Sequence, residues 1–233
     1  MNRRIMAVLS VLAVTLVSAS LPAQETPVLN SEVDRVNYGI GVGVARNFSN
    51  QGLDVNLDLV IRGMRDAHAG APLLLTEEEL ARTMNAFQKE LRQRQAEAFK
   101  AAGEKNLKEG EAFLAANAKK EGVTVLPSGL QYRVLKTGAG KIPTAADSAE
   151  CHYRGTFIDG REFDNSYKMG KPVTFKIQGG VIPGWSEALK LMPEGSKWEV
   201  FLPSRLAYGE RGAGSQIGPN MTLIFEIELL AVK

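Results

Sequence analysis

Cysteine and histidine are almost absent from this chain of 233 residues. Cys151 is the only cysteine, so no disulfide can form within the chain. Of the two histidines, His68 stands near the end of a helical pattern, with no second metal ligand nearby in sequence. We interpret it as a surface or capping residue, a metal ligand being the alternative. The sequence therefore predicts no metal site and no cofactor.

The single thiol lies in the alternating stretch AECHYRG, which is typical of a strand. Consecutive side chains on a strand point to opposite faces of the sheet, so His152 is badly placed to act as a base for Cys151. We interpret Cys151 as a small buried apolar residue, and a catalytic thiol is the alternative.

No apolar run in the chain is long enough to span a bilayer comfortably. The longest, residues 5–17, has about 13 residues, whereas a membrane helix needs about 20. Arg3 and Arg4 precede this run, and small residues follow it. This layout predicts a secretory signal peptide over residues 1–23, cleaved after Ala23 or, as second choice, after Ser20. An uncleaved membrane anchor is the alternative, and the lack of a nearby cysteine disfavours a lipid anchor.

An excess of charge of either sign is also missing. The formal net charge is +2, from 28 basic and 26 acidic residues. Loss of Arg3 and Arg4 with the signal peptide leaves 26 of each sign and a net charge of zero. Binding to nucleic acid needs a local surplus of Lys and Arg, so no nucleic-acid partner is expected.

What the chain does have, first, is a helical half. Ser31 is placed to cap a helix, and Gly70 is placed to end a second one. Apolar residues recur at helical spacing in both segments. They are Val33, Val36, Ile40 and Val44 in the first, and Leu57, Val60, Ile61, Met64 and Ala67 in the second. We predict a helical N-terminal domain over residues 24–75.

A long helix is predicted next, over residues 76–121. Thr76 and Glu79 have the spacing of a capping box, and no proline occurs between residues 77 and 126. Such a helix reaches roughly 65 Å at 1.5 Å per residue. Gly103 and Gly110 each weaken it by about 1 kcal/mol, which favours local bending there.

The two short helices bury little apolar surface by themselves, and the long helix is polar on most faces. A long polar helix commonly bridges domains or chains. We therefore predict a homodimer built from the N-terminal half, with the long helix as a stalk. A monomer in which the helices cap the second domain is the alternative.

From about residue 122 the apolar period changes from 3.6 to 2. Five runs are strand-like, and Asp159-Gly160 is a hairpin signal. Only one short helix fits, over residues 184–191. The fold class is therefore α+β, with a mostly antiparallel sheet that holds one helix against its concave face.

The stretch GGVIPGWSEAL, residues 179–189, sets Trp185 at the start of that helix behind Pro183 and Gly184. An indole there would form a flat apolar floor facing the sheet. Other aromatic residues are available around it, and with them the sequence suggests a shallow aromatic cup. These are Tyr153, Phe163, Tyr208 and Phe225. That they are ordinary core residues is the alternative.

GGVIPGWSEAL, FDNS, LPSRLAYG and TLIFEIELL together resemble the FKBP family, the tacrolimus-binding peptidyl-prolyl cis-trans isomerases. The likeness covers residues 122–233. The N-terminal half is similar, more loosely, to the helical dimerisation domain of the Mip/FkpA-like branch. The resemblance implies an antiparallel β half-barrel around one short helix, preceded by an all-α dimerisation domain with a long connecting helix.

The resemblance also implies site residues. Those expected in catalysis are Tyr153, Phe163, Asp164, Trp185, Tyr208 and Phe225. Those expected to bind substrate are Val181, Ile182, Ala207 and Ile217. Gly180 departs from the family pattern, which often has Glu there, and this puts tight macrolide binding in doubt.

The implied activity is rotation of Xaa-Pro bonds in exported proteins, whose proline-containing polypeptides would be the clients. A homodimer is implied, and so is an inhibitor of the tacrolimus type. The expected location is the periplasm of a Gram-negative bacterium, and the sequence leaves an association with the outer membrane open. The alternative function is a weakly catalytic or non-catalytic dimeric holdase chaperone that grips apolar segments.

Overall fold

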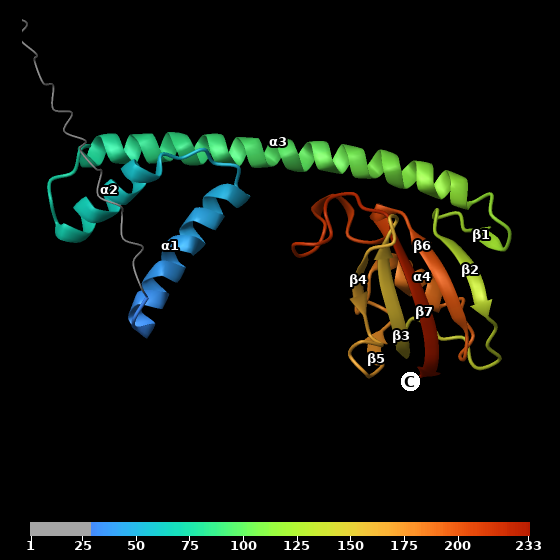
Figure 1. The fold of residues 1–233 in the computed structure, drawn as a ribbon. Coiled ribbons are helices and arrows are strands. Elements are labelled where there is room, and N and C mark those ends of the chain that lie inside the picture. The colour runs from blue at the N-terminus through green and yellow to red at the C-terminus, as the bar shows by residue number, and fades with distance from the viewer. Residues whose placement is uncertain (1–28) are drawn as a thin grey trace, which may run out of the picture. The chain divides into compact units, whose positions relative to one another are not determined.

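The computed structural model describes residues 29–233 (Figure 1). The predicted signal peptide and its cleavage sites lie outside the described residues. The chain divides into two compact units, with the boundary between Thr76 and Glu77. Among residues 29–233 no helix is both long enough and apolar enough to cross a membrane.

The first unit contains helices α1 (Glu32–Asn50) and α2 (Leu57–Ala69). Ser31 caps α1 by accepting from the Asp34 N–H, while the Asp34 carboxylate accepts from the Ser31 N–H, so the pair forms a capping box. Asn56 caps α2 through its side-chain oxygen, which accepts from the Leu59 N–H. Gly70 ends α2 at a φ of 62°, in the left-handed region that favours glycine.

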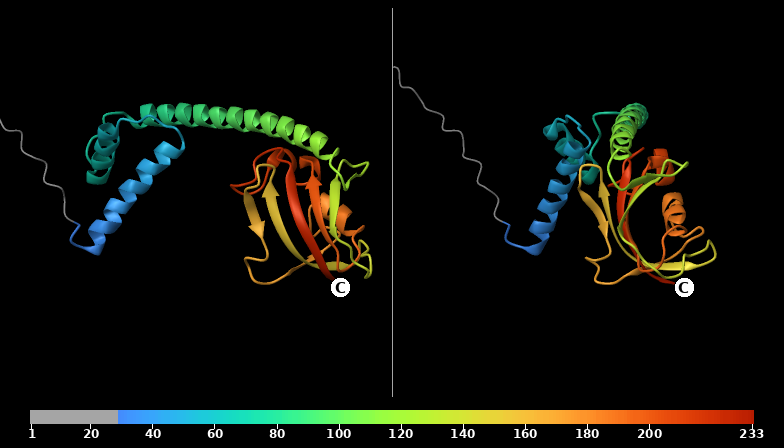
Figure 2. Two further views of the ribbon diagram at one scale, coloured as in Figure 1. Left: turned by 45° about the vertical axis from the view of Figure 1, so that its right-hand side comes forward. Right: turned by 90° about the vertical axis from the view of Figure 1, so that its right-hand side faces the viewer.

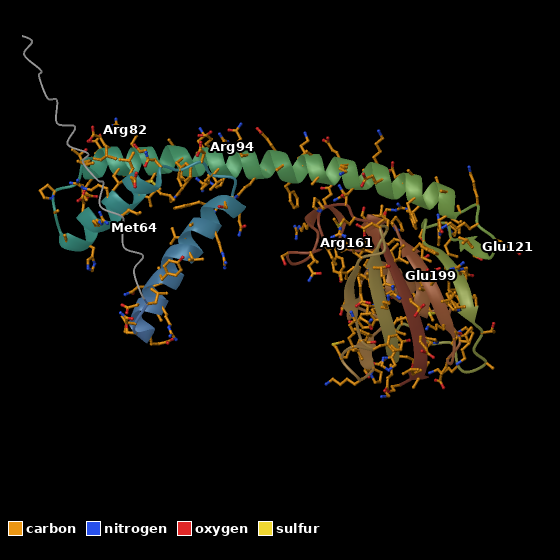
Figure 3. The ribbon with its side chains drawn as sticks, in the orientation of Figure 1. Met64, Arg82, Arg94, Glu121, Arg161 and Glu199 are labelled. Atoms are coloured by element: carbon orange, nitrogen blue, oxygen red, sulfur yellow. The ribbon has the colours of Figure 1, made fainter. Side chains whose placement is uncertain are left out.

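Apolar side chains on α1 and α2 are exposed. None of them is buried, and several expose between 42% and 66% of their surface. These are Val33, Val36, Tyr38, Ile40, Leu57, Leu59, Ile61 and Met64, of which Met64 is labelled in Figure 3. The one buried residue of the two helices is Asp66, whose carboxylate receives the Arg62 Nε at 2.8 and 2.9 Å. In this single chain, the first unit therefore has no apolar core of its own.

The second unit begins with α3 (Glu77–Asn117), one helix of 41 residues. The predicted long helix is therefore present. Three acidic residues occupy its first turn, where the helix dipole favours them. Gly103 and Gly110, the two glycines that favour bending, are buried contact points on its C-terminal half.

Seven strands form one sheet in which every pairing is antiparallel. They are β1 (Val123–Val125), β2 (Gln131–Lys136), β3 (Ser148–Phe157), β4 (Glu162–Asn165), β5 (Val173–Lys176), β6 (Lys197–Leu202) and β7 (Leu223–Val232). The order across the sheet is β1-β2-β6-β7-β3-β4. Strand β5 also pairs with β3, along residues 148–151, whereas β4 pairs with residues 154–156. One long strand therefore carries two short partners on the same edge.

Helix α4 (Pro183–Leu189) lies on the concave side of the curved sheet (Figure 2). Two 3₁₀ turns follow β6, η1 (Ser204–Leu206) and η2 (Gly209–Arg211). The core fills the space between helix and sheet, where Leu130, Ile177, Leu189, Met192 and Ile227 are fully buried. The predicted α+β class, with an antiparallel sheet around one short helix, is confirmed.

Candidate active site

A cavity of about 440 Å³ opens between the N-terminus of α4 and the concave face of the sheet. Eleven residues line it: Tyr153, Phe163, Asp164, Phe175, Gly179, Gly180, Val181, Ile182, Trp185, Tyr208 and Phe225. They come from β3, β4, β5, β7, α4 and two loops, so only the folded sheet assembles them.

Trp185 forms the floor of this cavity and is only 4% exposed. Pro183 occupies the first turn of α4, where its missing N–H costs nothing. Gly184 lets the helix approach the sheet closely, because a Cβ at this position would lie 2.4 Å from Leu202 Cδ2. Among the described residues no hydrogen-bond acceptor faces the Trp185 Nε1.

Aromatic edges and faces meet around this indole. The rings of Tyr153, Phe175 and Phe225 lie 5.2–5.3 Å from the Trp185 ring, with interplanar angles of 71–89°. Phe163 meets Phe225 in the same edge-to-face manner, at 5.5 Å and 88°. Such pairs stabilise one another by about 0.5–1.5 kcal/mol beyond their buried area. The walls of the cavity are therefore apolar and fixed in place.

One polar pair interrupts the apolar wall. The Tyr153 hydroxyl donates to Asp164 Oδ2 at 2.7 Å, and the Asn165 N–H donates to Asp164 Oδ1 at 2.8 Å. Burial, followed by the bond to Asp164, raises the pKa of Tyr153 well above its usual value near 10. The phenol therefore remains a donor at neutral pH and orients the carboxylate, which is exposed at the mouth of the cavity.

The rim carries two donors without partners. Among the described residues no acceptor is found for the Ile182 backbone N–H or for the Tyr208 hydroxyl, and Tyr208 is 38% exposed. Burial, and then the charge of Asp164, raises the pKa of Tyr208, so this hydroxyl is also neutral at pH 7. Two free donors at the edge of an apolar cavity can bind the carbonyl groups of a peptide.

The structure brings together eight of the ten residues expected in the site. The two others, Ala207 and Ile217, do not line the cavity. Both pack against the core, and Ile217 pairs with Ala213 across the loop after η2. Ala207 directly precedes Tyr208, which adjoins the turn η2, whereas Ile217 lies on the loop that follows η2.

Phe175, Gly179 and Gly180 also line the cavity, although they were not among the ten expected site residues. Phe175 pairs with Ala149, which is fully buried, so the alternation along β5 could have shown that this ring points inward. Gly179 has a φ of 78°, and a Cβ on Gly180 would lie 2.5 Å from the Lys176 carbonyl oxygen. Both glycines belong to the stretch GGVIPGWSEAL, and the departure of Gly180 from the family pattern was the one sign that it lies at the site.

Cys151 and His152 lie outside the cavity. Cys151 is fully buried, and burial raises the pKa of its thiol to about 12, so it cannot act as a thiolate nucleophile near pH 7. The His152 ring stacks on Tyr167 at 4.4 Å, away from the thiol's face of the strand. No group of His, Cys, Asp and Glu among residues 29–233 has the arrangement of a metal site.

Two family models match the chain. One, described as the domain amino terminal to FKBP-type peptidyl-prolyl isomerase, matches residues 33–134. The other, FKBP-type peptidyl-prolyl cis-trans isomerase, matches residues 140–230. The second range contains every residue of the cavity.

Relatives match almost the whole chain. "Outer membrane protein MIP" of Legionella longbeachae is 47% identical over 93% of this chain and 92% of its own length. "Peptidyl-prolyl cis-trans isomerase Mip" of Coxiella burnetii is 39% identical over 97% of both. The crystal structure of FkpA from Escherichia coli has a TM-score of 0.69 and 34% identity, covering 88% of this chain and 99% of that one. The chain thus belongs to the FKBP-type peptidyl-prolyl cis-trans isomerases and catalyses rotation of Xaa-Pro bonds.

Proposed function

We propose that the cavity above Trp185 is the place where the Xaa-Pro bond rotates. Its apolar floor and its walls, Phe163, Phe225 and Tyr153, fit a prolyl ring. Rotation is slow in water because it breaks amide resonance, with a barrier of about 18–20 kcal/mol. The twisted amide has a less polar carbonyl than the planar one. An apolar cavity that excludes water therefore favours the twisted form over the ground state.

Two rim donors anchor the peptide while the bond turns. The unpaired Ile182 N–H and the Tyr208 hydroxyl each donate a hydrogen bond to a substrate carbonyl. These bonds hold the chain on both sides of the proline in the orientation that rotation requires. The observation that supports this assignment is that both donors lack partners among the described residues.

Asp164 acts on the twisted carbonyl. Its carboxylate is held on both oxygens, by Tyr153 and by the Asn165 N–H. A carboxylate fixed in this way lies at the mouth of an otherwise apolar cavity, where its field acts on the carbon of the rotating carbonyl. The pairing of Tyr153 with Asp164 at 2.7 Å is the single observation that carries the proposal. Val181 completes the rim on the α4 side.

The test is the rate of cis–trans exchange of a short Xaa-Pro peptide, measured by NMR with catalytic amounts of the full chain. We expect Asp164→Ala and Trp185→Ala to lower the rate at least tenfold. Asp159→Ala is the matched control, since it removes an exposed carboxylate from the β3–β4 turn and should leave the rate unchanged. A folded Asp164→Ala chain with the wild-type rate would remove Asp164 from the mechanism.

The clients are proline-containing polypeptides in the cell envelope, and the protein is exported to the periplasm. The predicted signal peptide supports export, and the name of the Legionella relative points to the envelope. Fractionation of cells that express the full chain, with mass spectrometry of its new N-terminus, tests this. A periplasmic chain that begins after Ala23 is expected. A chain that keeps residues 1–23 in the cytosol would contradict it.

A macrolide of the tacrolimus type should compete with the peptide. Its affinity for this chain is expected to be reduced, because Gly180 supplies no side chain at the rim. Inhibition of the exchange rate by the macrolide, weaker than for family members with Glu at this position, would agree with this.

The first unit forms the dimer. Its apolar side chains are exposed in a single chain, and contiguous exposed apolar surface marks an interaction site. A second copy that presents the same helices would bury both sets. The dimer places two active sites on one molecule, and apolar surface left outside the interface would support binding of unfolded clients.

A further inference from the structure

The C-terminal half of α3 presents one continuous stripe to the rest of its unit. Gly103, Asn106, Gly110, Phe113 and Asn117 are three or four residues apart, so they share one face of the helix. Gly103, Gly110 and Asn117 are buried, and Asn106 is half-buried. Two of the five have no side chain and two are amides, so this face is built for close approach and hydrogen bonding.

The end of the stripe fixes the helix to the sheet. Phe113 contacts Phe201 of β6, with ring centroids 6.0 Å apart. Asn117 Nδ2 donates to Gln131 Oε1 at 3.0 Å, and Gln131 Nε2 donates back to the Leu114 carbonyl at 2.9 Å. These contacts join α3 to β2 and β6.

The beginning of the stripe contacts the loop that leads into β7. Asn106 Nδ2 donates to the Pro219 carbonyl at 2.8 Å, and Asn220 Nδ2 donates to the Gly103 carbonyl at 3.4 Å. A Cβ on Gly103 would lie 3.3–3.5 Å from Asn220 and Pro219. A Cβ on Gly110 would lie 2.2 Å from Thr222 Oγ1. Residues 219–222 are therefore held against the helix.

The same loop leads back to the active site. Asn220, the only described residue other than glycine with positive φ, has a φ of 56° and donates its N–H to the Gly209 carbonyl at 2.8 Å. Gly209 directly follows Tyr208 on the rim of the cavity. A short path thus runs from Asn106 through Pro219, Asn220 and Gly209 to Tyr208. Arg161, labelled in Figure 3, marks the β3–β4 connection, which faces the neighbouring part of α3.

We propose that Asn106 is a positioning residue of the isomerase. It holds the Pro219–Asn220 turn, which fixes Gly209 and so the place of the Tyr208 hydroxyl. Gly103 and Gly110 have no side chains and so allow residues 219–222 to lie close against the helix. Helix α3 is then part of the substrate-binding machinery in addition to connecting the two units. This inference rests on the proposed role of Tyr208 as a carbonyl anchor. An anchor that binds planar and twisted amide alike changes KM more than kcat.

The first experiment compares full chains carrying Asn106→Ala and Lys108→Ala. Lys108 is exposed on the same helix and serves as the matched control. Hydrogen exchange is read for residues 209–222, and KM and kcat for an Xaa-Pro peptide. For Asn106→Ala we expect at least tenfold faster exchange in this loop and a KM raised about three- to tenfold, with kcat within twofold. Lys108→Ala should match the wild type. Wild-type exchange or a wild-type KM in Asn106→Ala would overturn the proposal.

A double-mutant cycle with Tyr208→Phe separates this inference from the assignment of Tyr208. If Asn106 acts through Tyr208, then Asn106→Ala should not raise KM further in the Tyr208→Phe chain. Equal effects in both backgrounds would overturn the path through Tyr208. A wild-type KM in Tyr208→Phe alone would overturn the assignment of the anchor, and the positioning role with it.

Gly110→Ala tests the close approach by a second route. The added methyl group meets Thr222, so we expect the loop to loosen and KM to rise as in Asn106→Ala. Thr222→Ala removes Thr222 Oγ1, the atom nearest to the added methyl group. In the double variant it should therefore reverse part of the rise in KM. No restoration in a folded double variant would show that the contact does not hold the loop.

Discussion

Tyr153 is the residue in which the apolar and polar parts of the site meet. Its ring is 8% exposed and packs edge-on against Trp185, while its hydroxyl holds Asp164. Removing only the hydroxyl therefore separates the two contributions, since the aromatic wall stays in place.

For Tyr153→Phe we expect kcat/KM to fall about ten- to 150-fold, as a hydrogen bond to a charged group contributes roughly 1.5–3 kcal/mol. The peptide exchange assay measures this. Tyr167→Phe is the control, because the Tyr167 hydroxyl also donates to a carboxylate, Glu228, at 2.9 Å but lies away from the cavity. Similar losses in both variants would show a general effect on the fold instead of on Asp164.

The raised pKa values of Tyr153 and Tyr208 predict the response to alkali. Folding raises the pKa of each phenol above the value of about 10 that it has in the unfolded chain. The protonated phenols therefore stabilise the fold fully at any pH below about 10, and this stabilisation is lost as the pH rises through the pKa of the folded state. We expect kcat/KM to stay level between about pH 7 and pH 10 with respect to these groups. A decline near pH 9 that disappears in Tyr153→Phe or in Tyr208→Phe would contradict the shifts.

At the scale of elements, β3 supports the site through a residue without a side chain. A Cβ on Gly155 would lie 2.6 Å from Phe163 Cζ and 3.0 Å from Phe225 Cε1. Gly155 thus makes room for the two rings that form one wall of the cavity.

Gly155→Ala should therefore push Phe163 and Phe225 into the cavity. We expect a loss of activity of at least tenfold and a destabilisation of about 1–3 kcal/mol, the usual cost of overpacking. Thermal unfolding and the exchange assay measure the two effects.

Gly160→Ala is a poor control because Gly160 has a φ of 86°. Ala149→Gly on the same strand tests instead whether β3 tolerates loss of a methyl group without loss of the site. A fully active Gly155→Ala chain would contradict the packing argument.

The elements, and the aromatic residues of the cavity other than Phe175, could be predicted from the sequence because they lie in recognisable local motifs. Ser31 and Gly70 mark helix ends, and Trp185 stands behind two residues that turn the chain. The switch of partner along β3 has no such signal, since pairing depends on distant strands. The stripe on the C-terminal half of α3 that contacts the sheet and the loop before β7 was also missed. Apart from Phe113 it consists of glycines and amides, which a search for apolar periodicity does not detect.

At the scale of the molecule, the exposed side chains of α1 allow a test of the proposed dimer. We expect Val36→Asp, which puts a charge in the apolar surface of the first unit, to give monomers by light scattering. Asn37→Asp adds the same charge on the neighbouring residue, about 100° round the helix, and should leave the dimer intact. Peptide turnover per subunit should survive, since the cavity lies in the second unit. An unchanged mass for Val36→Asp would contradict the proposed interface.

Strand β7 has a further consequence for how the protein is made. Among residues 29–233 it is the only strand that joins β1-β2-β6 on one side to β3 with its two short partners on the other, yet it comes last among the strands in chain order. While the ribosome is still adding residues 223–232, the sheet exists only as two unjoined parts. Long-range pairing of this kind is slow, and it follows synthesis. The complete sheet can therefore form only after translation has passed this strand.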